Sequence, residues 1–215
     1  MKADCIIFDV DGTLVDTFPG IIDSFIYAIK QNGLPPPNKA EVSTVIGHHL
    51  DDMFKMITGI EQQAIIEMLV RTYREHYPIH GLPRSKLFPG ARKVLDGLLE
   101  NGKVLAIASN KPKSYGDILM KDLGISPLFK SIQFNELDGL DLKFTKADLI
   151  RRAMDETHAE DAVMVGDSVI DIRAAKELGV KTIACAFNGD SSERLLAEGP
   201  DIVIKDISEL TYILS

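Results

Sequence analysis

Two acidic residues near the N-terminus, Asp9 and Asp11, have a spacing that suits metal binding and nucleophilic chemistry. They lie in a segment (DVDGT, residues 9–13) that directly follows an apolar run with the composition of a buried strand. Two carboxylates followed by Gly12, which lets the backbone turn, can hold a divalent cation and aim one oxygen at an electrophile. A plain Asp-Gly turn is the alternative, but parallel-sheet proteins bind ligands directly after their strands, which favours a site.

A second acidic segment repeats this arrangement further along the chain. Asp167 follows another apolar run, and Asp171 comes four residues later in a segment with helical periodicity. Residues four apart share one face of a helix, so both carboxylates can serve one metal ion, as ligands or from its outer shell. A Gly-Asp pair is common at strand-to-helix turns, and this segment gains its value from repeating the pattern of a strand followed by an acid.

Two further segments offer groups that can bind a phosphoryl oxygen. Ser109 and Asn110 follow an apolar run and provide a hydroxyl, an amide and backbone N–H groups, although they suit a helix N-cap equally well. A lysine also lies near the start of a helix-period segment. Lys146 is the preferred candidate, and Lys143, three residues earlier, is the alternative.

The elements that must position these residues alternate between strands and helices. Short apolar runs predict strands at residues 5–8, 104–108, 162–165 and 180–184, with a shorter one at 202–204. Helix-period segments lie at about 90–101, 113–123, 146–157 and 170–178. Near-continuous apolar strands separated by helices are typical of a parallel sheet covered on both faces. The sequence therefore predicts an α/β fold with a doubly wound, Rossmann-like parallel-sheet core.

Residues 16–82 interrupt this alternation. Isoleucines and a phenylalanine recur at helical spacing over 21–29, prolines follow at 35–37, and helical periodicity returns at about 42–57 and 65–77 with no convincing strand. We therefore predict a small all-helical domain at 16–82, inserted after the first strand. The α/β core is then formed by residues 1–15 and 83–215.

Composition narrows the class of protein and its partners. The chain has 215 residues and a net charge of −8, which disfavours nucleic acid and anionic lipid, so we expect neither a nucleic-acid nor a membrane partner. Cys5 and Cys185 lie in apolar runs and are expected to be buried thiols, which favours a reducing compartment. With no signal peptide and no run of about 18 apolar residues, the expected location is cytoplasmic.

The four segments, taken in order, resemble the four motifs of the haloacid dehalogenase-like hydrolase superfamily. The matching residues are 9–17 (DVDGTLVDT), Ser109 with Asn110, Lys146, and 166–171 (GDSVID). The chain is similar to the phosphoglycolate phosphatase-like branch, in which a helical cap is inserted between the first two motifs. Many relatives have Thr-Asn in place of Ser109-Asn110, and a Lys-Pro pair in place of either Lys143-Phe144 or Lys146-Ala147. The resemblance spans nearly the whole chain.

This resemblance implies hydrolysis of a small phosphomonoester, such as 2-phosphoglycolate, through a covalent aspartyl-phosphate. Asp9 is then the nucleophile, and Asp11 is the acid and base that protonates the leaving oxygen and activates water. Ser109 and Lys146 complete the catalytic set. The implied cofactor is Mg²⁺, with Asp9, Asp11 (through its backbone carbonyl), Asp167 and Asp171 as its ligands or outer shell. The residues expected to contact phosphate or substrate are Gly12, Thr13, Ser109, Asn110, Lys146 and His48.

The cap and the substrate leave several alternatives open. The loop at Gly47-His48-His49 can face the metal site and contact the substrate, although adjacent histidines at a helix end are more often exposed and idle. A small phosphorylated metabolite is the expected partner, and the chain is expected to be a monomer or a homodimer. The alternatives are a sugar phosphomutase of the same superfamily, a pyrophosphatase or nucleotidase, a dehalogenase, which Asp11 argues against, and a non-catalytic binding module.

Overall fold

The structure is a computed structural model, and it describes residues 1–135, 144–187 and 192–214. The chain folds as two compact units. One unit comprises Met1–Asp16 and Leu87–Ser215, and the other comprises Thr17–Lys86. The sequence predicted an insertion at 16–82, and the second unit runs from Thr17 to Lys86.

The first unit is built on a six-stranded parallel sheet with the order β5-β4-β1-β6-β7-β8. Its strands are β1 (Cys5–Phe8), β4 (Val104–Pro112), β5 (Ser131–Asn135), β6 (Ala162–Gly166), β7 (Lys181–Cys185) and β8 (Ile202–Ile204). The predicted α/β fold is confirmed. The edge strand β5 was not predicted from the sequence. Two short strands, β2 (Val15–Asp16) and β3 (Lys86–Leu87), form a separate sheet.

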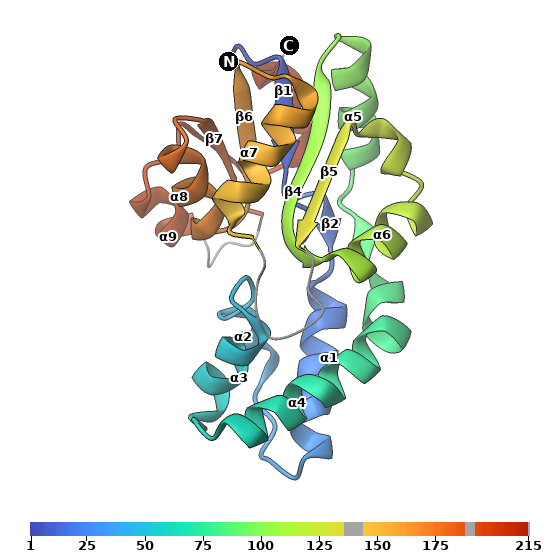
Figure 1. The fold of residues 1–215 in the computed structure, drawn as a ribbon, viewed down its shortest axis with the longest axis vertical. Coiled ribbons are helices and arrows are strands. Elements are labelled where there is room, and N and C mark those ends of the chain that lie inside the picture. The colour runs from blue at the N-terminus through green and yellow to red at the C-terminus, as the bar shows by residue number, and fades with distance from the viewer. Residues whose placement is uncertain (136–143, 188–191, 215) are drawn as a thin grey trace. The chain divides into compact units, whose positions relative to one another are not determined.

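Helices cover both faces of the six-stranded sheet (Figure 1). They are α5 (Ala91–Glu100), α6 (Lys113–Asp122), α7 (Lys146–Thr157), α8 (Val169–Glu177), α9 (Ser192–Ala197) and α10 (Leu210–Ile213). Because both faces are covered, every residue of β1 and of β6 is buried. This explains why these strands read as continuous apolar runs in the sequence.

The second unit is helical, with α1 (Phe18–Gln31), α2 (Lys39–Ser43), α3 (Leu50–Thr58) and α4 (Gln63–His76), followed by a π-helical turn (Tyr77–Gly81) and a 3₁₀ turn (Leu82–Arg84). The rings of Phe25 and Phe54 stack in its core with their centroids 4.2 Å apart. The helical periodicity over 42–57 corresponds to two helices, α2 and α3, with the loop at Gly47-His48-His49 between them. The chain breaks between α2 and α3, where Gly47 has a φ of 104°, a value that side-chain-bearing residues rarely adopt.

The structure also describes the two cysteines and the length and polarity of the helices. Cys5 and Cys185 are both buried and both free, as predicted. Within the described residues, we find no helix with the length and apolar character that crossing a bilayer requires.

Candidate active site

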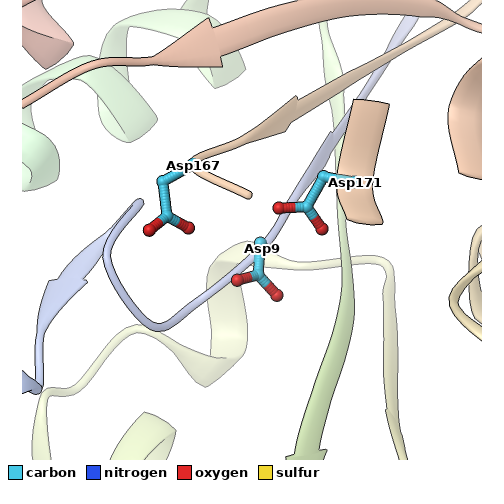
Figure 2. A group of neighbouring side chains, drawn as sticks. All are labelled: Asp9, Asp167 and Asp171. Atoms are coloured by element: carbon cyan, nitrogen blue, oxygen red, sulfur yellow. The ribbon is translucent and has the colours of Figure 1, made fainter. Parts of the chain in front are cut away.

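Three carboxylates meet at the C-terminal edge of the parallel sheet (Figure 2). Asp9 directly follows β1, Asp167 directly follows β6, and Asp171 lies in the first turn of α8. One oxygen of each lies within 4.8 Å of an oxygen of the others. Because β1 and β6 are parallel neighbours, their carboxyl ends bring residues 158 positions apart in the chain to one place.

The loop after β1 is shaped to receive Asp167. Gly12 has a φ of 78°, and a Cβ atom there would lie 2.1 Å from Oδ2 of Asp167. Thr13, which is fully buried, donates a hydrogen bond from Oγ1 to Oδ1 of Asp167 over 3.2 Å. Both residues were predicted to contact phosphate, and the structure places them against the second acidic segment. Glycine is therefore needed at position 12 to let the two acidic segments approach each other, and the Thr13 hydrogen bond joins them.

Helix α7 carries the predicted lysine into this cluster. The Nζ atom of Lys146 lies 2.7 Å from Oδ1 of Asp9 and 2.7 Å from Oδ1 of Asp171, and its side chain is 3% exposed. Lys146 is the first residue of the helix, whose N-cap, Thr145, forms a capping box with Asp148. The alternative candidate, Lys143, lies outside the described residues.

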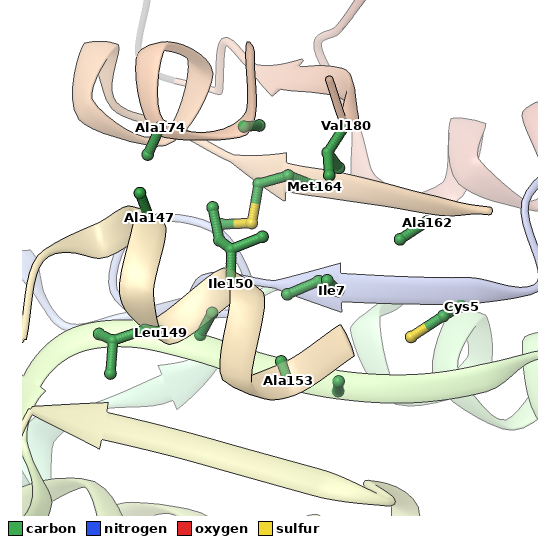
Figure 3. Close-up of a cluster of buried hydrophobic side chains, with 13 residues drawn as sticks. Cys5, Ile7, Ala147, Leu149, Ile150, Ala153, Ala162, Met164, Ala174 and Val180 are labelled. Carbon is green, nitrogen blue, oxygen red and sulfur yellow. The ribbon is translucent and has the colours of Figure 1, made fainter. Parts of the chain in front are cut away.

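Apolar packing fixes the position of α7 on the sheet (Figure 3). Ala147, Ile150 and Ala153 are buried on the face of the helix that meets the strands. They pack with alternate residues of β1, Cys5 and Ile7, within one buried cluster. A helix anchored in this way holds the lysine at its first position with little freedom to move.

Both oxygens of Asp171 are engaged by the protein. Oδ1 accepts from Lys146, and Oδ2 accepts from the backbone N–H and the hydroxyl of Ser168, at 3.0 and 2.7 Å. Among the described residues, hydrogen bonds engage one oxygen each of Asp9 and Asp167. Asp9 and Asp167 are thus the better placed of the three to ligate a cation, and Asp171 is better placed to hold Lys146.

Burial and crowding alter the ionisation of these groups. Burial raises the pKa of Asp9 to about 6, although the ammonium of Lys146 opposes the rise. Burial, followed by the charges of Asp9 and Asp171, raises the pKa of Asp167 well above its usual value. Burial alone would lower the pKa of Lys146, but the neighbouring carboxylates outweigh it and the pKa lies above its usual value. Carboxylates crowded in this way attract a divalent cation, which removes their mutual repulsion.

The end of β4 supplies the third predicted segment. The hydroxyl of Ser109 is buried and accepts from the backbone N–H of Lys111 over 3.3 Å. Within the described part of the chain, the buried Oδ1 of Asn110 has no hydrogen-bond partner. The pairing of β4 with β5 shifts register between Ser109 and Pro112, so this stretch departs from a regular strand.

One further residue of this site, Lys111, was not predicted from the sequence. Its Nζ atom lies 2.9 and 3.1 Å from the two carboxylate oxygens of Asp11, and its side chain is 3% exposed. No local pattern indicated it, because the chain departs from a regular strand between Ser109 and Pro112 and the alternation of side chains along a strand does not hold there.

The remaining predicted residue, His48, belongs to the helical unit. It lies between α2 and α3 and is exposed, as is His49, which precedes α3. Its contact with a substrate stays a prediction.

Comparison with known proteins identifies the family. The family described as haloacid dehalogenase-like hydrolase matches residues 6–185. The chain belongs to this family. The residues that the structure gathers at the edge of the sheet, Asp9, Lys146, Asp167 and Asp171, all lie within the matched range.

Individual relatives of this haloacid dehalogenase-like hydrolase carry several names. The chain is 31% identical to a 5'-nucleotidase from Pseudomonas aeruginosa, over 97% of this chain and 94% of that protein. It is 30% identical to a phosphoglycolate phosphatase from Agrobacterium fabrum, over 97% and 91% of the two chains. Among solved structures, a haloacid dehalogenase-like family hydrolase from Streptococcus pneumoniae superposes with a TM-score of 0.87, at 28% identity, over 98% and 97% of the two chains.

Proposed function

We propose that this haloacid dehalogenase-like hydrolase is a Mg²⁺-dependent phosphatase that acts on a small phosphomonoester. The observation that carries the proposal is the convergence of Asp9, Asp167 and Asp171 within 4.8 Å, with the buried Lys146 bound to two of them. The names of the relatives, phosphoglycolate phosphatase and 5'-nucleotidase, support the same class of reaction. We take 2-phosphoglycolate as the leading substrate and nucleoside 5'-monophosphates as the second class.

Asp9 is the proposed nucleophile. Lys146 engages its Oδ1 atom, and burial keeps the carboxylate poorly hydrated, so the second oxygen is fixed and available to attack phosphorus. Attack forms an aspartyl-phosphate and breaks the bond from phosphorus to the ester oxygen. Water then attacks this intermediate, which releases phosphate and restores the carboxylate.

Asp11 is the proposed acid and base of the two half-reactions. It lies two residues after the nucleophile, and its side chain is 22% exposed, so both a leaving group and water can reach it. In the first half-reaction it gives a proton to the leaving ester oxygen, and in the second it takes a proton from the attacking water. One carboxyl therefore ends the cycle in the state in which it began.

Charge balance supports a role for Mg²⁺. Asp9, Asp11, Asp167 and Asp171 together carry a charge of −4 when all are ionised. A phosphomonoester adds nearly −2 near neutral pH. The oxygen donors of Asp9 and Asp167 suit a hard cation such as Mg²⁺, and Asp171 supports them through Lys146. When bound there, Mg²⁺ would neutralise charge between the nucleophile and the phosphate.

Other residues of the site bind and orient the phosphate. We propose that the Ser109 hydroxyl and the Asn110 amide contact its oxygens, and that Lys146 adds a cation. The helical unit would serve as a cap, with His48 among the residues that select the substrate. Positioning and electrostatic stabilisation are most of what phosphoryl transfer requires of a protein.

A panel of phosphorylated compounds tests this proposal. Purified protein would be assayed for released phosphate on 2-phosphoglycolate, nucleoside 5'-monophosphates, sugar phosphates and pyrophosphate, with Mg²⁺ or with a chelator. We expect release from at least one monoester, which the chelator and Asp9→Asn both abolish. Isomerised sugar phosphate without free phosphate would identify a mutase instead, and phosphate release that Asp9→Asn leaves intact would contradict the proposal.

A further inference from the structure

We propose that Lys111 is a positioning residue that holds the Asp11 carboxylate in the orientation needed for proton transfer. This inference rests on the proposed function, because it concerns the acid and base of that reaction. The contact that supports it was not predicted from the sequence. The Lys111 ammonium reaches both oxygens of Asp11, at 2.9 and 3.1 Å.

The backbone around Lys111 is built to direct its side chain. The partner of Ser109 on β5 is Phe134 and the partner of Pro112 is Asn135, so β4 advances three residues while β5 advances one. Such an irregularity redirects side chains and is common next to active sites. The hydroxyl of Ser109 also accepts from the Lys111 backbone N–H, which ties the redirected residue to a predicted phosphate contact.

The Lys111–Asp11 ion pair is more buried than the surface pair formed by Lys113, two residues later in the chain. Lys113 lies 2.7 Å from Asp117, but the two side chains are 54% and 52% exposed. A pair of that kind contributes little to stability, because water solvates both charges. The Lys111 side chain is 3% exposed, so its charge depends on the protein for its partners.

The Asp11 carboxyl must point toward the reacting oxygen to transfer a proton, and a buried partner can hold it there. Asp11 lies on a loop, and its side chain is partly exposed, so rotation about its side-chain bonds would carry the carboxyl away from the reacting oxygen. A proton donor must lie within hydrogen-bond reach of the atom that it protonates. A two-oxygen contact from a buried ammonium restricts that rotation. Lys111 keeps its own proton throughout, and the protons move between Asp11, the leaving oxygen and water.

A pair of esters that differ in the basicity of the leaving group can detect this role. Phenyl phosphate and 4-nitrophenyl phosphate have similar shapes, but phenolate is the more basic leaving group and depends more on protonation. We expect Lys111→Met to lower kcat/KM on phenyl phosphate by at least about tenfold more than on 4-nitrophenyl phosphate, since general acid catalysis is worth roughly 10²–10⁴-fold. Lys111→Arg, which keeps a charged donor, should restore part of the difference.

Two further variants connect the effect to Asp11. Asp11→Asn should show the same dependence on the leaving group, and adding Lys111→Met to it should lower kcat/KM by less than about threefold further, because positioning residues act through their partner. Lys113→Met is the matched control, since it breaks the exposed lysine-aspartate pair, and it should leave both esters unaffected. Thermal unfolding of each variant checks the fold. If Lys111→Met does not fold, kcat/KM of Lys111→Gln is measured on the same two esters.

The outcomes separate this inference from the proposed function. Equal losses on the two esters, no loss, or a loss of similar size in the Asp11→Asn background would overturn the positioning role of Lys111. The first and third of these results would mean that Lys111 binds the phosphate or supports the fold. The proposed function fails separately, if the wild-type protein hydrolyses neither ester or if Asp9→Asn retains activity.

Discussion

The two buried lysines of the active site hold their carboxylates in different ways. Lys146 lies between Asp9 and Asp171, at 2.7 Å from each, and both the helix that carries it and the helix of Asp171 begin with capping boxes. Lys111 contacts Asp11, whose side chain is partly exposed at 22%. Asp9, Asp171 and Lys146 thus form a closed side of buried charges. The Asp11 side is the open side, which water can reach. This difference suits a fixed nucleophile and a group that exchanges protons.

The largest effect is expected at Asp9, the proposed nucleophile. Asp9→Asn removes the attacking oxygen while keeping the shape of the side chain, so kcat should fall by at least roughly 10⁴-fold on every ester. Assays of phosphate release on phenyl and 4-nitrophenyl phosphate measure this loss. A variant that keeps a tenth of the wild-type rate would show that the closed set of charges does not contain the nucleophile.

The next effect is expected at Asp11 and depends on the substrate. Asp11→Asn should lower kcat/KM on phenyl phosphate by roughly 10²–10⁴-fold, because proton transfer to a basic leaving group is lost. The loss on 4-nitrophenyl phosphate should be smaller. Binding of Mg²⁺, measured by calorimetry, should persist, because the Asp9 and Asp167 carboxylates remain. An unchanged rate on both esters would contradict the assignment of Asp11.

The loss in free energy of unfolding should also differ between variants of Lys146 and Lys111. Lys146→Met leaves two buried carboxylates without their cation, and breaking a buried pair in this way costs about 3–5 kcal/mol of unfolding free energy. Lys111→Met should cost less, because Asp11 is partly exposed and can be hydrated. Denaturant unfolding without Mg²⁺ measures both, and Mg²⁺ should recover part of the loss in Lys146→Met. Equal losses in the two variants would remove the distinction between closed and open sides.

A smaller effect is expected from pH on the stabilisation by Mg²⁺. The pKa of Asp9 is raised by burial to about 6, so between its ordinary value of 3.8 and about 6 the folded protein binds more protons than the unfolded chain. Without metal, the stability from this group is therefore present at low pH and falls as pH rises through that window. Protons compete with metal for the same oxygens.

At about pH 7.5, Mg²⁺ at about 100 times its Kd should therefore raise the free energy of unfolding by roughly 2.7 kcal/mol. The same Mg²⁺ concentration should raise it by less at about pH 5. Thermal unfolding with and without Mg²⁺ at the two pH values measures this difference. A stabilisation that is larger at the lower pH would contradict the sign of the pKa shift. A matched measurement on Asp167→Asn should show a reduced response at both pH values.

The residues of the closed side were conspicuous in the sequence. The strands that carry Asp9 and Asp167 are fully buried, so they appear as apolar runs, and an acid directly after such a run is conspicuous. Lys146 could be predicted because it begins a helix with clear periodicity. In each case the local pattern of the chain and its place in the sheet agree.

The sequence could not predict features that depend on partners distant in the chain. Strand β5 (SIQFN) includes polar Ser131, Gln133 and Asn135, so it has no apolar run, and its pairing with β4 defines it. Lys111 looked like any polar residue after a motif, because only the fold brings Asp11 to it. The contacts of Gly12 and Thr13 with Asp167 were likewise hidden, since they join segments about 150 residues apart.

The most direct test of the proposed chemistry is to trap the covalent intermediate. Asp11→Asn would be mixed with 4-nitrophenyl phosphate and Mg²⁺, quenched in acid and examined by mass spectrometry of the intact protein and its peptides. Because this variant lacks the base that activates water, the intermediate should accumulate, with one phosphoryl group on the peptide that contains Asp9. Nitrophenol release without any phosphorylated protein, or a phosphoryl group on another residue, would contradict the assignment of Asp9 as the nucleophile.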